Sequence, residues 1–171
     1  MGVNEIIKKR KSVRKYKEGA VVTDEQVRTI LEAGMLAPSA RNKRPWEFIV
    51  VRNRKILDEV AVLHPHGSML KTASLAIVVC ADLNSQKGIS EGFFPQDCGA
   101  ATENILLQAV DLGLGTCWCG VYPREYGITE FRRIFNLPEN IIPFNIIAVG
   151  VPEEEWGARG FYEEEKVTWI K

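Results

Sequence analysis

The segment from residue 97 to residue 112 constrains the fold most, because it predicts a helix that is apolar on nearly every side. Its sequence, DCGAATENILLQAVDL, spreads alanine, isoleucine, leucine and valine around the helical circumference. Asp97 is the expected N-cap, and Gly113 and Gly115 follow the expected end. Such a helix has no broad face suited to water, so we expect it inside the molecule or inside a dimer.

Four apolar segments predict the strands on which this helix packs. Leu75 to Ala81 is apolar throughout, which indicates a strand covered on both faces. The other three expected strands are Trp46 to Arg52, Thr116 to Tyr122 and Asn145 to Val151. Further helices are expected at residues 4–9, 23–35, 54–63 and 129–136. Strands interleaved with helices predict a layered α/β or α+β sandwich, and residues 1–171 show no linker or repeat that would divide one domain.

The charge balance excludes several classes of partner. Lysine and arginine together number 22, as do aspartate and glutamate, so no overall field recruits nucleic acid or a membrane surface. The longest apolar run is far too short to span a bilayer, and the N-terminus lacks an apolar signal core, so we expect a cytoplasmic protein. The four cysteines lie in apolar segments and are expected to be reduced and buried, and His64-Pro65-His66 makes a poor metal clip.

A basic segment near the N-terminus offers a possible phosphate site. On charge alone, RKSVRKY suits a solvated helix end, because cations favour a helix C-terminus. In an extended chain, however, Arg10, Ser12 and Arg14 point to the same side. Two guanidinium groups and a hydroxyl can surround a phosphate with charge-assisted hydrogen bonds.

Two further segments combine an ordinary structural role with a possible binding role. Residues 37–46 are predicted to form a loop between a helix and a strand. In this loop, the Asn42 side-chain amide offers one donor group and one acceptor, which suit the edge of a heterocycle. Residues 113–120 lack the third glycine of a dinucleotide fingerprint and follow a helix rather than a strand. Their glycines therefore favour a helix end that enters a core strand, although Gly120 also allows backbone to approach a flat ligand closely.

These segments resemble the nitroreductase family. The match consists of RKSVRKY, APSARNKRPWEFIVV, DCGAATENILLQA, GLGTCWCG, IIAVGVPEE and a tail with an arginine followed by KVTW, in the family's order over nearly the whole chain. The resemblance implies a three-layer α+β fold whose mostly antiparallel central sheet is flanked by helices. It also implies a homodimer that exchanges a C-terminal strand, here Lys166 to Ile170.

The resemblance implies FMN bound at the subunit interface. The implied cofactor-binding residues are Arg10, Lys11, Ser12, Arg14, Pro38, Ser39, Asn42, Trp118, Cys119, Gly120 and Arg159. The basic segment would hold the phosphate and the pyrimidine side, and the loop would line the ring partly from the opposite subunit. The stretch Trp118 to Gly120 would lie beside flavin N5. No side chain is implied as acid or base. Three departures stand out: Arg44 replaces a glutamine, Arg159 lacks its neighbouring proline, and Cys119 is uncommon.

The function implied by the resemblance is reduction of flat acceptors, such as nitroaromatics or quinones, by NAD(P)H in a ping-pong reaction. On the same fold, the sequence leaves open a reductive dehalogenase or a flavin-cleaving enzyme. It also leaves open a flavin-binding redox sensor or carrier without turnover, and a phosphate-binding module without flavin. Phe93 and Phe94 suit a substrate lid and a core position equally well.

Overall fold

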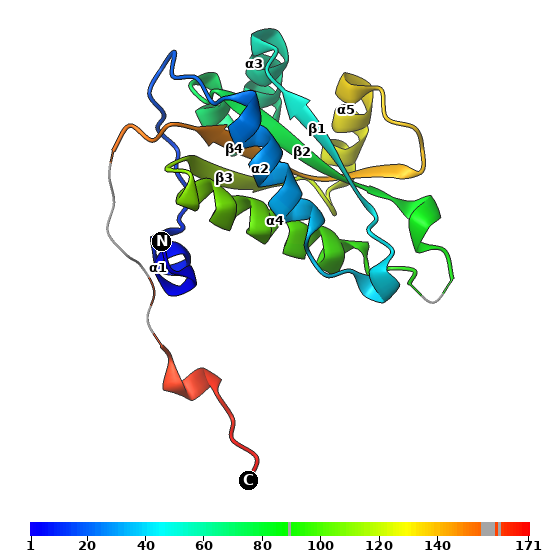
Figure 1. Ribbon diagram of the computed structural model, residues 1–171. Helices are drawn as coiled ribbons and strands as arrows, with labels where there is room; N and C mark the ends of the chain where they lie inside the picture. The colour runs from blue at the N-terminus through cyan, green and yellow to red at the C-terminus, as the bar shows by residue number, and fades with distance from the viewer. Residues whose placement is uncertain (89, 155–159, 161) are drawn as a thin grey trace.

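The chain forms a four-stranded antiparallel sheet with helices on both faces (Figure 1). The computed structural model describes residues 1–88, 90–154, 160 and 162–171. The strands, in their order across the sheet, are β1 (Trp46–Val51), β2 (Leu75–Asp82), β4 (Ile141–Gly150) and β3 (Gly115–Gly120). Every neighbouring pair is antiparallel. The expected α+β fold with an antiparallel sheet is confirmed.

The helices divide into two layers around the sheet. They are α1 (Val3–Lys9), α2 (Asp24–Met35), α3 (Arg54–Leu63), α4 (Phe94–Asp111) and α5 (Glu125–Phe135). One core joins α2 and α4 to the β2 side chains Ile77 and Val79, and the other joins α3 and α5 to Val78 and Cys80. Alternate strand residues point to opposite faces, so β2 is apolar throughout because both faces are covered. No helix in the described ranges has the length and apolar character to cross a membrane.

The start of α4 corrects one expectation from the sequence. The helix begins at Phe94, so Asp97 lies in its first turn and is not the N-cap. The Asp97 carboxylate instead accepts hydrogen bonds from the Ala40 backbone N–H at 2.9 Å and the Gln86 amide at 2.6 Å. A buried carboxylate requires donors, and here they come from a distant loop and from the short 3₁₀ helix Leu83–Gln86. The other end of α4 agrees with expectation, because Gly113 follows it with φ +73°.

The described C-terminal segment, residues 162–171, forms no strand with the sheet of its own chain, and its exchange with a partner stays a prediction. Residues Glu164–Lys166 form a short 3₁₀ helix, and no strand is assigned at residues 167–171. The Trp169 and Ile170 side chains are 72% and 96% exposed. The segment lies away from the sheet (Figure 1), so no neighbouring strand offers it backbone hydrogen bonds within this chain.

A pair of glycines lets the N-terminal segment lie directly on the sheet. Gly115 of β3 pairs with Gly150 of β4. A Cβ on Gly150 would lie 2.7 Å from Cδ1 of Tyr16, and a Cβ on Gly115 would lie 2.9 Å from Cβ of Val13. The Val13 N–H donates to the Thr116 carbonyl at 2.8 Å, and the Tyr16 hydroxyl donates to the Val13 carbonyl at 2.8 Å. The glycines therefore fix the path of the segment that carries Arg14.

Replacing Gly150 with alanine should test this packing. The added Cβ overlaps the buried Tyr16 ring, so we expect the free energy of unfolding to fall by about 1–3 kcal/mol. Urea unfolding followed by tryptophan fluorescence measures the change. Gly2→Ala is the control, because a Cβ there meets nothing within 4 Å. Equal stability of the two variants would show that the glycine pair does not set this contact.

Candidate functional site

A cavity of about 370 Å³ beside β3 collects part of the predicted site. Four of the predicted cofactor residues line it: Arg14, Trp118, Cys119 and Gly120. Arg14 comes from the segment that crosses the sheet, and the other three come from the end of β3. The cavity therefore joins two parts of the chain that are about a hundred residues apart, with a guanidinium group on one side and strand backbone on the other.

Sequence reasoning missed two histidines at this cavity. His64 and His66 follow α3 and line the cavity together with Gly120. The Nε2 atom of His64 lies 2.9 Å from the Gly120 carbonyl oxygen, and the His66 backbone N–H lies 3.1 Å from Nδ1 of His64. Nε2 is therefore the protonated nitrogen and donates to Gly120, while Nδ1 accepts from His66. The only signal in the sequence was the close spacing of the two histidines directly after the helix expected at residues 54–63.

Two thiols face the same cavity and differ in acidity. Cys117 and Cys119 are both nearly buried on one face of β3. The neighbouring Cys119 thiol lowers the pKa of Cys117 to about 7, with further lowering by Arg14 and Ser12 against the effect of burial. The same neighbour and burial raise the pKa of Cys119. Ser12 and Arg14 thus act on one thiol, in keeping with their expected position on the same side of the segment.

Arg10 interacts elsewhere in this chain. Its Nε lies 3.5 Å from a carboxylate oxygen of Glu103 on α4. Partial burial raises the pKa of Glu103, and the charge of Arg10 opposes that shift. The neighbouring Lys11 is half-buried. A phosphate at Arg10 would therefore compete with the Glu103 carboxylate for the guanidinium group.

The loop at residues 38–44 is strained and bonded to itself. Arg41, Asn42 and Arg44 all have positive φ, at 51°, 55° and 49°, a region that side chains other than glycine rarely adopt. The Arg44 N–H donates to the Ser39 hydroxyl at 2.9 Å, and the Arg44 Nε donates to the Asn42 side-chain oxygen at 2.9 Å. Pro38 is exposed. A strained loop with exposed polar groups is a reasonable candidate for ligand contact.

This loop does not reach the Arg14 cavity within one chain. It is anchored through Ala40 to Asp97 in the first turn of α4, whereas the amino group of Met1, just before α1, bonds Asp111 in the last turn. Fourteen helical residues separate these anchors, which corresponds to about 21 Å. Figure 1 shows the loop and α1 at opposite ends of α4. None of the residues 38–44 lines the cavity.

Aromatic rings surround the outer edge of β3. Trp118 is 37% exposed and meets Phe144 edge-on at 6.0 Å between ring centroids. Phe94 is buried against Tyr122 at 5.0 Å, whereas Phe93 is exposed. The two phenylalanines therefore have different environments: Phe94 packs in the core, and Phe93 is free of that packing and open to solvent.

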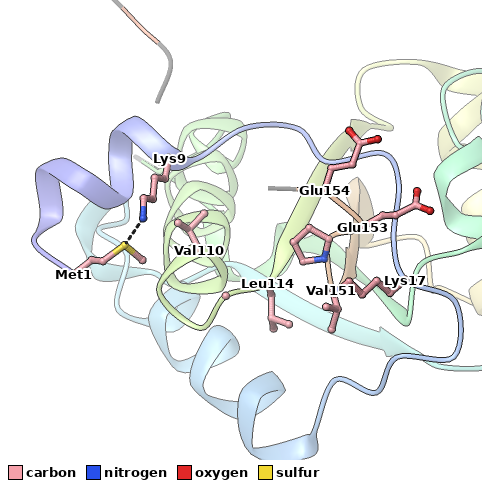
Figure 2. A pocket seen from close by; sticks show the side chains of 10 residues that line it. Met1, Lys9, Lys17, Val110, Leu114, Val151, Glu153 and Glu154 are labelled. Atoms are coloured by element: carbon pink, nitrogen blue, oxygen red, sulfur yellow. Dashed lines mark hydrogen bonds between the residues drawn. The ribbon is translucent and has the colours of Figure 1, made fainter. Parts of the chain in front are cut away.

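A second cavity, of about 420 Å³, lies where α1 meets the end of α4 and residues 151–154 (Figure 2). Val110, Leu114 and Val151 form its apolar part, and Lys9 lies at its rim with Nζ 3.3 Å from the Met1 sulfur. It contains none of the predicted cofactor residues that the structure describes. Arg159 lies outside the described residues. Within those residues, no group of three or more His, Cys, Asp or Glu side chains is placed to hold a metal.

Comparison with known proteins identifies the family of this chain. Residues 7–151 match the family model described as "Nitroreductase family". The chain belongs to the nitroreductase family. It is 46% identical over 167 residues to a Methanothermobacter thermautotrophicus protein named "Putative NADH dehydrogenase/NAD(P)H nitroreductase", covering 98% of this chain and 86% of the relative.

Solved nitroreductase structures resemble the whole chain. An FMN-dependent nitroreductase from Clostridium difficile R20291 is 34% identical with a TM-score of 0.88, covering 98% of this chain and 99% of that one. A nitroreductase-like protein from Desulfovibrio desulfuricans, solved in complex with FMN, is 30% identical with a TM-score of 0.82. The match covers 100% of this chain and 97% of that one.

The cysteine environments predict selective alkylation. Because the pKa of Cys117 is lowered to about 7, its thiolate fraction should rise as the pH increases through neutrality. Iodoacetamide should therefore label Cys117 several times faster at pH 8 than at pH 6, as measured by peptide mass spectrometry. Burial raises the pKa of Cys80 to about 12, so Cys80 should stay unlabelled at both pH values. Labelling of Cys117 at a rate independent of pH would contradict this assignment.

Proposed function

We propose that this protein is an FMN-dependent oxidoreductase that uses NAD(P)H to reduce flat acceptors, such as nitroaromatics or quinones, by a ping-pong mechanism. The observation that carries the proposal is the Arg14 cavity at the end of β3, in a chain that matches a nitroreductase–FMN complex along its full length. The names of the similar proteins agree with use of NAD(P)H. We further propose that residues 1–171 act as one FMN-binding unit in the cytoplasm.

The residues at the cavity suit a flat anionic cofactor. Its volume of about 370 Å³ falls within the usual range for ligand pockets, about 300–1,000 Å³. Gly120 presents bare backbone, because a Cβ there would meet only the Tyr122 carbonyl oxygen at 4.0 Å. Arg14 supplies a cation beside this surface. A planar ring can therefore approach the strand while its negative charge faces the guanidinium group.

The chain's own residues would position the cofactor and support its charge. FMN, when bound, accepts hydride from the nicotinamide and passes electrons to the acceptor. Arg14 would stabilise negative charge on the pyrimidine side, and His64 would hold the Gly120 carbonyl through its Nε2 hydrogen bond. The exposed face of Trp118 and the open position of Phe93 would contact the acceptor.

A second copy of the chain would complete the site. Pro38, Ser39 and Asn42 do not line the Arg14 cavity of their own chain, so we propose that the loop carrying them contributes to the site of a partner. The exposed Trp169 and Ile170 suit the exchanged strand expected at residues 166–170, because a partner's sheet would bury them. We therefore propose a homodimer with FMN at the interface and with Arg10, Lys11, Ser12 and Arg159 near the phosphate.

Reduction by nicotinamide tests the proposed activity directly. The purified protein should be yellow, and NADH or NADPH added without air should bleach the flavin absorbance. A nitroaromatic or quinone added next should restore the colour, as a ping-pong reaction requires. Colour that does not bleach with either nucleotide would favour a flavin sensor over a reductase. A colourless protein that takes up no FMN would contradict the proposal as a whole.

Replacing Arg14 with alanine should weaken FMN binding. Loss of a charge-assisted hydrogen bond should reduce the binding free energy by about 1.5–3 kcal/mol, measured by quenching of flavin fluorescence. Arg14→Lys should recover part of the affinity, because it keeps the charge but not the bidentate geometry. Arg52→Ala is the matched control, since that exposed arginine pairs with Asp24 away from the cavity. An unchanged dissociation constant for Arg14→Ala would remove Arg14 from the site.

A further inference from the structure

The buried carboxylate of Asp97 joins three parts of the chain. Asp97 lies in the first turn of α4 and is 4% exposed. One carboxylate oxygen accepts from the Ala40 N–H at 2.9 Å, and the other accepts from the Gln86 amide at 2.6 Å. Both donors are neutral, and a carboxylate costs more free energy to bury than a neutral side chain does. A carboxylate accepts on both oxygens, however, so it can bond these two donors at once.

Gln86 is oriented for this contact, although the orientation leaves its own oxygen without a partner. The residue is 2% exposed and ends the 3₁₀ helix Leu83–Gln86, which follows β2. Its Nε2 donates to Asp97, while its Oε1 is buried with no hydrogen-bond partner among the described residues. A buried acceptor without a partner costs free energy, so the carboxylate decides which way this amide points. The segment after β2 therefore fixes the carboxylate that Ala40 contacts.

The loop at residues 38–44 depends on this carboxylate for its attachment. Three of its residues have positive φ, and such backbone persists only where neighbouring contacts enforce it. Most hydrogen bonds of the loop are internal, such as the one from the Arg44 N–H to the Ser39 hydroxyl. Within the described ranges, the bond from Ala40 to Asp97 is the one hydrogen bond that ties the loop to another element. Asp97 therefore determines where the loop stands relative to α4.

We propose that Asp97 is a positioning residue for the FMN site: with Gln86, it holds the loop in the strained form that presents Ser39 and Asn42 to the flavin of a partner subunit. This inference rests on the proposed function. Asp97 does not line the Arg14 cavity, so it acts through the loop. A loop that is ordered before the cofactor arrives loses little conformational freedom on binding, and the affinity for FMN is correspondingly higher. Release of the loop should therefore weaken FMN binding without changing any group that contacts the flavin.

Limited digestion with trypsin tests the positioning role without relying on FMN. The loop supplies exposed cleavage sites at Arg41, Lys43 and Arg44. Asp97→Ala should be cut there about tenfold faster than the parent protein, as the loss of one hydrogen bond to a charged group predicts. Asp97→Asn should stay close to the parent rate. Its oxygen can accept from Ala40, and its amide can donate to the unpartnered Oε1 of Gln86 once the Gln86 amide turns over.

Two controls separate release of the loop from general unfolding. Asp111→Ala removes a carboxylate from the other end of α4, where it bonds the Met1 amino group, and should leave cleavage of the loop unchanged. Cleavage at the arginines of α5 should stay at the parent rate in every variant. If Asp97→Ala is also cut faster in α5, Gln86→Leu replaces it in both measurements. That variant keeps the carboxylate but removes one of its donors, so it should speed cleavage of the loop severalfold.

FMN affinity is the second measurement, and it separates this inference from the proposed function. The dissociation constant, followed by flavin fluorescence, should rise about tenfold in Asp97→Ala and stay near the parent value in Asp97→Asn. Equal loop cleavage in Asp97→Ala and the parent, or an unchanged dissociation constant, would overturn the inference, while FMN binding by the parent would still uphold the proposed function. A parent protein that takes up no FMN would overturn both.

Discussion

The close contact between the N-terminal segment and the Gly115–Gly150 pair underlies the rest of the structure. Side chains at either glycine would overlap Val13 or Tyr16, so the segment can lie against β3 and β4 only because both positions lack a Cβ. Backbone hydrogen bonds from Val13 to Thr116 and from Lys17 to Val151 then hold it along the sheet. With Val13 and Tyr16 buried, Arg14 is left beside the cavity. A packing constraint in two strands thus positions the charge on which the proposed FMN binding would depend.

The chemistry of the cavity is local and does not follow from the chain's overall properties. The whole chain has no net charge, yet two arginines and two histidines line one wall of a cavity that also contains two thiols. The Cys119 thiol and, to a smaller extent, Arg14 lower the pKa of Cys117. Burial raises the pKa of Cys80 and Cys98, with smaller contributions from the nearby carboxylates of Glu47 and Asp97. Such differences arise because electrostatic interactions weaken with distance and screening. The groups nearest a thiol therefore affect its pKa more than the net charge of the whole chain does.

Helix α4 is apolar on nearly every side, and its packing accounts for much of this. One side packs on the sheet and α2, while Ala100 and Leu107 on other sides are half-buried rather than polar. Asp97 anchors the strained loop to this helix through Ala40, so the helix also fixes where the loop stands. In the proposed homodimer, the same helix would set the separation between the loop and the cavity it serves.

Residue patterns alone determined the elements and much of the basic site. The unbroken apolar run of β2 and the Thr23–Gln26 capping box are local, and both predictions are confirmed. The spacing of Arg10 to Arg14 predicted one shared side, but Arg10 pairs with Glu103 while Arg14 lines the cavity. Only the tertiary structure showed that the Cys119 thiol donates to the His66 carbonyl, 53 residues away. It also showed that Asp97 accepts from the Ala40 N–H and does not cap its own helix. Periodicity reports which face of an element is buried, but it carries no information about which distant residues meet there. Those meetings depend on how the layers pack.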